Sequence, residues 1–160
     1  MDKSKFDVVK NSPIAVELND QQIETLAKIV EIRKLQDGEF LIEEGKIDNA
    51  LHVVIGGEIA VVKRSGVDEE QILHLHRSGE LAGAMGFVDG LEHSATLRSF
   101  GESQLYSFNR NDFEGLLKND AEIVYKVMRS VVRNVHSIVR RMNDHYIQMT
   151  NYISKQSGRY

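Results

Sequence analysis

The chain has 160 residues, of which 41% are hydrophobic and 28% charged, and a formal net charge of −4. This is the composition of one ordinary soluble domain, and the acidic balance argues against a globally basic nucleic-acid binder. Cysteine is absent, which excludes disulfides, thiolate zinc sites and a cysteine nucleophile. The opening MDKSKFDVVKNS has no apolar run like a signal peptide, and no stretch is long enough to span a bilayer, so we expect a cytoplasmic protein.

The N-terminal part predicts one short helix. We expect residues 1–13 to be a polar leader, followed by a domain over residues 14–119. The run LNDQQIETLAKIV favours a helix because Asn19 with Gln22 has the spacing of a capping box. Leu18 and Ile23 have the spacing of a hydrophobic staple before and after that cap.

From about residue 30, short runs of β-like texture follow one another. They are separated by glycines or charged turns such as Gly56-Gly57 and Gly101, and GVDEEQ has the character of a solvated hairpin tip. Many short strands with turn residues between them favour an antiparallel sandwich or barrel. We therefore expect a mainly β fold of eight or so strands with flanking helices. The runs are EIRKL, EFLIEEG, LHVVIGG, EIAVVKR, QILHLH, SATLRS and QLYSFN.

Two helices are predicted after the strands. Asn109 can cap a short one, with Phe108 and Phe113 placed as a staple. Asn119 with Glu122 repeats the capping-box spacing and opens a long helix over residues 120–153, which leaves 154–160 as a tail.

The long helix carries two adjacent apolar columns. Spacings of four and three form a coiled-coil seam, and a second column repeats every seven residues beside it. We predict a parallel homodimer through this helix; the alternative is that the whole stripe packs on its own barrel. The seam is Val124, Met128, Val131, Val135, Ile138, Met142, His145 and Met149; the second column is Tyr125, Val132, Val139, Tyr146 and Ile153; and Lys126, Arg129, Arg133 and Arg140 are predicted to form a solvated face.

The stretch GELAGAMGFVDGLEHSATLRS, residues 79–99, has the composition of a phosphate-cradling loop. Glycines recur through it and a cation, His93, precedes the strand-like end. It holds no lysine, and its one arginine, Arg98, lies beyond the loop. We call residues 79–95 the cassette.

The order of elements resembles the cyclic nucleotide-binding domain superfamily, and most of all the sensor domain of catabolite-activator-type bacterial regulators. The resemblance covers residues 14–150 and rests on GEFLIEEG, LHVVIGGEIAVV and the cassette. It implies a double-stranded β-helix, a cupin-like jelly-roll barrel, with an N-terminal helix and a long C-terminal helix. It also implies a site for cyclic AMP or cyclic GMP at Gly83, Ala84, Met85, His93, Ser94 and Ala95.

Two cassette positions depart from the family pattern. Ala84 stands where the family has a glutamate for the ribose hydroxyl, and His93 stands where an arginine pairs with the cyclic phosphate. The family's base contact from the long helix falls near Ile138, beside Ser137. Each lost contact costs about 2–4 kcal/mol, so we expect weak or altered ligand binding. Another small anion, or no small ligand, are the alternatives.

A second cluster has metal-ligand spacing. His74, His76 and Glu80 follow the H-x-H-x(3)-E pattern of metal-binding cupins, whose remaining ligand would have to be His93. We predict no metal, and a metal-dependent cupin enzyme is the least favoured function. Ser94 lacks an evident general base, so we expect no enzyme activity.

After the long helix only SKQSGRY remains, too short for a helix-turn-helix, so we expect no DNA binding and no membrane association. The sequence predicts a dimeric regulatory domain with a small anionic ligand. A ligand-free module that binds a protein partner is the alternative.

Overall fold

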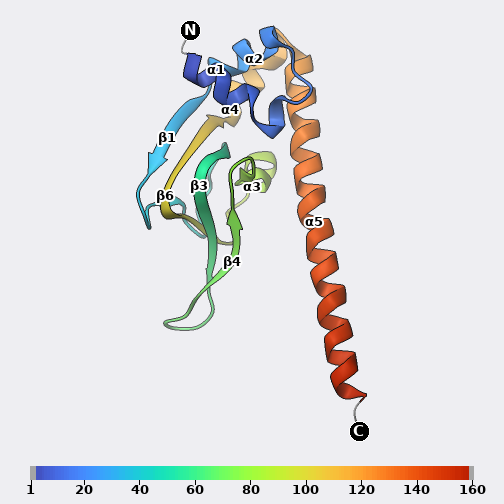
Figure 1. Ribbon diagram of the computed structural model, residues 1–160. Helices are drawn as coiled ribbons and strands as arrows, with labels where there is room; N and C mark the ends of the chain where they lie inside the picture. The colour runs from blue at the N-terminus through green and yellow to red at the C-terminus, as the bar shows by residue number, and fades with distance from the viewer. Residues whose placement is uncertain (1–2, 159–160) are drawn as a thin grey trace.

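The computed structural model describes residues 3–158, in which a curved antiparallel sheet is flanked by helices. A long helix runs beside the sheet and extends beyond it (Figure 1). The elements are α1 (Lys3–Lys10), η1 (Pro13–Ala15), α2 (Asp20–Ala27), β1 (Glu31–Leu35), β2 (Phe40–Ile42), β3 (Ala50–Arg64), β4 (Glu70–His76), β5 (Leu81–Ala82), α3 (Ala84–Asp89), β6 (Thr96–Asn109), α4 (Arg110–Gly115), η2 (Leu116–Lys118) and α5 (Ala121–Ser157).

Strands β3 and β6 form the backbone of the sheet. They pair from Ala50↔Asn109 to Val62↔Thr96, and the sheet order is β1-β6-β3-β4, with β2 also on β6 and β5 also on β3. These two long strands curve, so that the sheet closes on itself as a roll around a small apolar core. That core contains Leu35, Ile42, Val54, Ile59, Ala82, Leu97 and Leu105. The predicted mainly β fold with flanking helices is confirmed.

The predicted number of strands was wrong because three glycines bend strands instead of ending them. The register of β3 against β6 shifts on both sides of Gly56, and Gly57 has φ +72°. Gly101, inside β6, has φ +73°. Because of such a bend, the two halves of one strand can lie on different sides of the roll. Hence the described residues form six strands where eight or so were predicted.

Replacing Gly57 with alanine is expected to destabilise the fold more than the same change at Gly101. Both positions have positive φ, which costs a residue with a Cβ about 1–2 kcal/mol. A Cβ on Gly57 would also collide with the Glu102 carbonyl, whereas nothing lies within 4 Å of one on Gly101. Urea unfolding should show an additional loss of about 1–3 kcal/mol for Gly57→Ala. An equal loss of unfolding free energy in the two variants would show that β6 moves away from the new Cβ without an energetic penalty.

The N-terminal residues pack against the roll. Residues 1–13 were predicted to be a polar leader outside the domain, but Lys3–Lys10 form α1, and Val9 and Ser12 are buried. Val9 is fully buried in the helical part of the core, which explains why this largely polar segment folds. The predicted capping box of α2 is confirmed, since Gln22 N donates to Asn19 Oδ1 at 2.9 Å and Asn19 N donates to Gln22 Oε1 at 3.2 Å.

The two C-terminal helices begin close to the predicted positions. Asn109 caps α4 by accepting from Asp112 N, and the Phe108 and Phe113 rings lie 5.2 Å apart. The cap of α5 is Asp120, which accepts from Ile123 N, and not the predicted Asn119. The helix continues to Ser157, so part of the predicted 154–160 tail is helical, and residues 159–160 lie outside the described range.

Helix α5 is buried only along its first half. Ile123, Val127 and Val131 join the core, while residues 141–158 are all exposed. On the predicted solvated face, Arg129, Arg133 and Arg140 are exposed and Lys126 is half-buried. Arg129 and Arg133 both pair with Glu17, at 3.0 and 2.9 Å. No described helix has both the length and the apolar character needed to cross a membrane.

Candidate functional site: the glycine cassette

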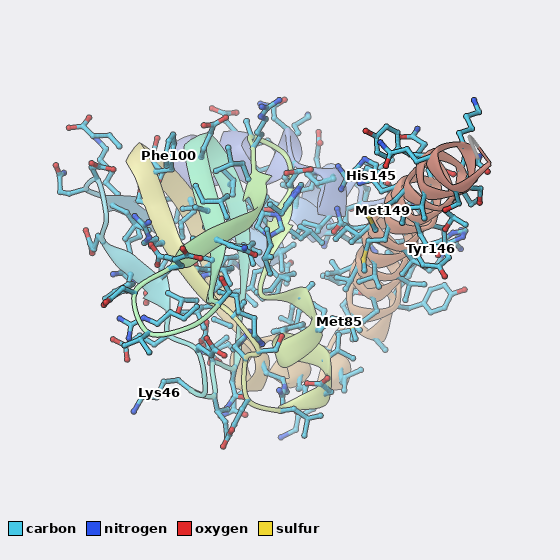
Figure 2. The ribbon with its side chains drawn as sticks, turned by 90° about the horizontal axis from the view of Figure 1, so that it is seen from below. Lys46, Met85, Phe100, His145, Tyr146 and Met149 are labelled. Atoms are coloured by element: carbon cyan, nitrogen blue, oxygen red, sulfur yellow. The ribbon has the colours of Figure 1, made fainter. Side chains whose placement is uncertain are left out.

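Two left-handed glycines delimit the short helix of the cassette. Gly83, with φ +73°, precedes α3, and Gly90, with φ +71°, ends it. Ala84 is buried, whereas Met85 is exposed (Figure 2). In both views α3 lies on the side of the roll that faces α5 (Figures 1 and 2). The glycine scaffold predicted from the sequence is therefore formed, with Ala84 at its first helical position.

The His93 ring lies directly against this scaffold. A Cβ on Gly86 would be 2.5 Å from His93 Nε2, and one on Gly83 would be 3.6 Å from His93 Cε1. The main chain of His93 is fixed by two hydrogen bonds, from its N–H to the Lys46 carbonyl and from Gly45 N to its own carbonyl. His93 Nε2 is buried without a hydrogen-bond partner among the described residues. The imidazole ring therefore packs on the surface that Gly83 and Gly86 form.

Ser94 and Ala95 continue from His93 into β6. Ser94 is exposed, and its carbonyl accepts from Lys63 Nζ at 2.8 Å, while Ala95 is buried. The six predicted site residues therefore belong to two segments, 83–85 and 93–95, which the structure brings together where the His93 ring lies against Gly83 and Gly86. Ser137 and Ile138, the predicted base contacts, lie on α5, where Ser137 is exposed and Ile138 half-buried.

A partly buried polar chain supports the loop that holds His93. His52 Nε2 lies 2.6 Å from Asp48 Oδ2, and His52 Nδ1 lies 2.6 Å from Ser107 Oγ. Burial opposes ionisation of Asp48, yet its hydrogen bond and charge interaction with His52 outweigh burial and hold its pKa below the usual value. Because both ring nitrogens of His52 are engaged, the chain fastens the loop before β3 to β6.

Arg110 connects the cassette helix to the helices that follow. As the first residue of α4, it donates from Nε to the Phe87 carbonyl and from Nη2 to the Gly86 carbonyl, at 2.7 and 3.0 Å. The Phe87 ring also contacts those of Phe108 and Phe113, with centroids 5.7 and 5.6 Å apart. Arg110 and the Phe87 ring therefore join α3 directly to α4.

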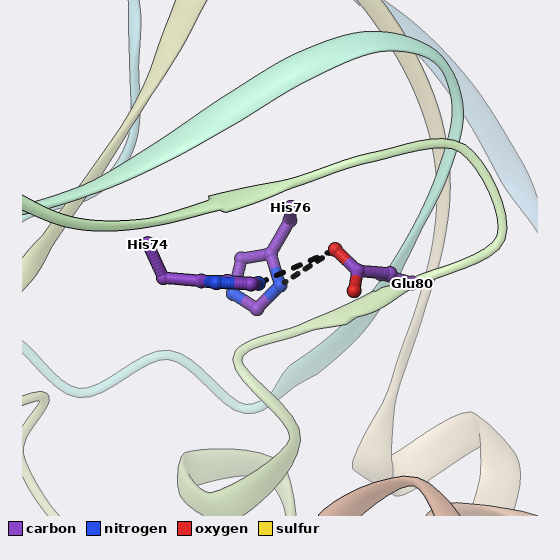
Figure 3. A group of neighbouring side chains, drawn as sticks. All are labelled: His74, His76 and Glu80. Atoms are coloured by element: carbon purple, nitrogen blue, oxygen red, sulfur yellow. Dashed lines mark hydrogen bonds and ion pairs between the residues drawn. The ribbon is translucent and has the colours of Figure 1, made fainter. Parts of the chain in front are cut away.

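The second cluster, His74, His76 and Glu80, is assembled in the structure (Figure 3). Its ligand atoms all lie within 4.8 Å of one another. Glu80 Oε2 lies 3.3 Å from His74 Nε2 and 3.8 Å from His76 Nδ1, and Glu80 Oε1 lies 3.3 Å from Arg141 Nη1 on α5. The remaining ligand that a cupin site would require, His93, belongs to the cassette and is not part of this cluster.

The cluster is electrostatically perturbed. Burial, aided by the neighbouring His74, lowers the pKa of His76 to about 4, against the opposing effect of Glu80. Burial works against ionisation of Glu80, but the Arg77 N–H, the two histidines and Arg141 outweigh it and keep its pKa below the usual value. Glu80 is therefore a carboxylate at neutral pH, facing a neutral His76.

Stability is expected to fall as the pH drops from about 6.5 to about 4. In this window the unfolded chain protonates His76 and the folded chain does not, which costs up to about 1.4 kcal/mol per pH unit. His76→Gln should flatten this dependence in urea unfolding with a chelator present. His136→Gln, the same change at an exposed position, should keep the wild-type slope. An unchanged slope for His76→Gln would contradict the assignment.

Sequence reasoning missed Asp48, His52 and Arg110. Ser107 lies 55 residues from His52, and Gly86 lies 24 residues from Arg110, so no local spacing signals these two contacts. Asp48 lies only four residues from His52. The one available signal was a histidine within the apolar run LHVVIGG, which implies a buried polar partner.

Comparison with known proteins places this arrangement in a family. The model of the cyclic nucleotide-binding domain matches residues 32–120, more than half of the chain. The chain belongs to the cyclic nucleotide-binding domain family. The predicted resemblance is thereby confirmed, and the six-stranded roll with its long C-terminal helix is this family's jelly-roll fold.

Solved structures and relatives agree with this membership. A cyclic nucleotide-binding domain from Methylobacillus flagellatus superposes with a TM-score of 0.82 at 18% identity, covering 91% of this chain and 84% of that one. The catabolite activator protein of Thermus thermophilus gives 0.64 at 21% identity, covering 89% and 63%. An NTE family protein of Mycobacterium tuberculosis is 23% identical over 125 residues, 78% of this chain. The chain spans about a fifth of the length of that relative (21%).

Proposed function

We propose that this cyclic nucleotide-binding domain is a dimeric, non-enzymatic sensor whose cassette binds cyclic AMP or cyclic GMP weakly, or binds another small anion. The observation that carries the proposal is the position of His93. Its ring lies on Gly86, where the resemblance implies an arginine paired with the cyclic phosphate. With Ala84 replacing the ribose-binding glutamate, the cassette keeps its backbone and loses both strong side-chain contacts.

The proposed output passes through Arg110. Because Arg110 binds two carbonyls of α3, a ligand that moves the cassette would shift α4 and then α5. Such a response requires a ligand with different affinities for two states of the domain. Without one, the domain would act as a module that binds a protein partner.

The proposed dimer uses the second apolar column of α5. Its members, Tyr125, Val132, Val139, Tyr146 and Ile153, repeat every seven residues and are all exposed. With the seam residues Met142 and Met149, which are also exposed, the column gives the alternating spacings of three and four that pair two helices. The column continues past residue 141, where α5 no longer packs on its own roll. A second copy of the chain is therefore the occupant that this surface fits best.

The absence of enzyme activity is proposed from the surroundings of Ser94. Among the hydrogen bonds of residues 3–158, none joins Ser94 Oγ to a histidine, which a serine nucleophile would need. A further relative, the neuropathy target esterase sws of Drosophila erecta, is 25% identical over 150 residues, but the shared part is only 10% of its length and so does not alter this proposal.

Calorimetric titration with cyclic AMP, cyclic GMP and inorganic phosphate tests the sensor. At about pH 7.5 and near pH 6 we expect cyclic nucleotides to give saturable heat only at high ligand concentration, because the cassette lacks both strong side-chain contacts. Tight binding at either pH would contradict the degenerate cassette. No heat with any of the three would favour the protein-binding module.

A further inference from the structure

The cluster of His74, His76 and Glu80 lies outside the six residues predicted to bind the nucleotide. The two histidines are two residues apart on β4, so their rings project from the same face, and their centroids lie 4.7 Å apart. Glu80, in the turn before β5, directs Oε2 toward both rings (Figure 3). Three side chains of types that bind metals therefore point toward one another, two from β4 and one from the turn that follows it.

The donors are held in place by the surrounding backbone. Strand β4 is paired with β3 through Val61↔His74 and Ile59↔His76. The turn is fixed because Val54 N donates to the Glu80 carbonyl at 3.1 Å and Arg77 N donates to Glu80 Oε2 at 2.8 Å. Ligands positioned in this way lose little conformational freedom on binding.

We propose that His74, His76 and Glu80 bind one divalent transition-metal ion of the Zn²⁺ class. Two imidazole nitrogens and one carboxylate oxygen form a donor set that suits Zn²⁺ or Co²⁺ better than Mg²⁺ or Ca²⁺. The present separations, all within 4.8 Å, need only side-chain adjustment to surround an ion. Three protein ligands leave the fourth position to water.

The charges nearby are compatible with an ion. An ion bound at His74 Nε2 would take the place of the 3.3 Å contact that this nitrogen makes with Glu80 Oε2. Arg141 contacts the other oxygen, Oε1, and so holds the carboxylate in place from α5 without occupying the ligand atom. Hydrogen bonds of this kind orient carboxylate ligands in known metal sites. The ion would thus lie where α5 meets the roll.

Glu80 lies near the start of the cassette, but none of the three ligands is among the six residues predicted to bind the nucleotide, so metal binding can be measured separately from nucleotide binding. The test is a calorimetric titration of untagged, chelator-treated protein with Zn²⁺. We expect one equivalent to bind at micromolar protein, and His74→Ala and Glu80→Gln each to weaken binding beyond the roughly 10–100-fold cost of losing a second-shell partner. His136→Ala, an exposed histidine outside the cluster, should bind like the wild type.

The visible spectrum of the Co²⁺-loaded protein gives a second readout, and circular dichroism shows whether a variant that lacks the bands is still folded. Wild-type protein should show the intense bands of a four-coordinate ion, and Glu80→Gln, with unchanged circular dichroism, should lose them. Sub-stoichiometric binding would overturn the proposal. So would wild-type affinity in both His74→Ala and Glu80→Gln.

Discussion

Replacing Ala84 with glutamate and His93 with arginine together is expected to tighten cyclic AMP binding by at least about 100-fold, equivalent to about 2.8 kcal/mol. The two changes restore the ribose hydroxyl acceptor and the forked phosphate contact that the family resemblance implies. Each contact is worth about 2–4 kcal/mol, so the expected gain is less than their sum. Titration calorimetry of wild type and double variant measures it.

A control variant separates this gain from a general change in charge. Val88→Glu with Leu91→Arg adds the same two charges to the same segment at exposed positions outside the predicted site. It should leave cyclic AMP affinity near that of the wild type. If the control gains as much as the Ala84/His93 variant, or if neither gains, the two departures do not explain weak binding.

Replacing Val139 and Tyr146 with glutamate is expected to convert a dimer into a monomer. Both side chains are exposed in the single chain and belong to the second apolar column of α5. In a paired helix each would face its counterpart, and four carboxylates would be brought together in an apolar interface. Sedimentation velocity should show the wild type as a dimer and the variant as a monomer of unchanged helix content.

Substitution is a better test than removing α5. Ile123, Val127 and Val131 are buried in the core, so a chain ending near residue 120 would lose stability as well as any interface. Arg140→Glu, beside Val139 but outside both apolar columns, is the matched control and should remain dimeric. The proposed interface would be contradicted if the wild type is a monomer, or if the variant with glutamate at Val139 and Tyr146 remains a dimer.

The sequence was informative where the determinants are local. Asn19 with Gln22, Asn109 and the cassette glycines act within a few residues, and their predicted roles as caps and turns appear in the structure. The number of strands was less predictable, because a glycine with positive φ can end a strand or bend it. Only the pairing of β3 with β6 decides which of these Gly57 does.

The candidate site shows the same division. Its glycine scaffold and the departures at Ala84 and His93 could be recognised from residue types alone. The packing of His93 on Gly86 and the hydrogen bonds of Arg110 to α3 depend on the folded chain bringing distant segments together. Likewise, Glu17 and the α5 arginines are more than 100 residues apart, so their ion pairs could not be anticipated from helix periodicity.

The most direct test of the degenerate cassette is a ¹H–¹⁵N correlation spectrum of the wild-type protein titrated with cyclic AMP. We predict the largest shifts at the amides around Gly83, Ala84, His93, Ser94 and Ala95, with smaller ones along α4 and α5, in fast exchange and with saturation only at high ligand concentration. A slow-exchange complex formed at one equivalent would contradict the claim that Ala84 and His93 weaken the site. Shifts that leave the cassette untouched would contradict its location.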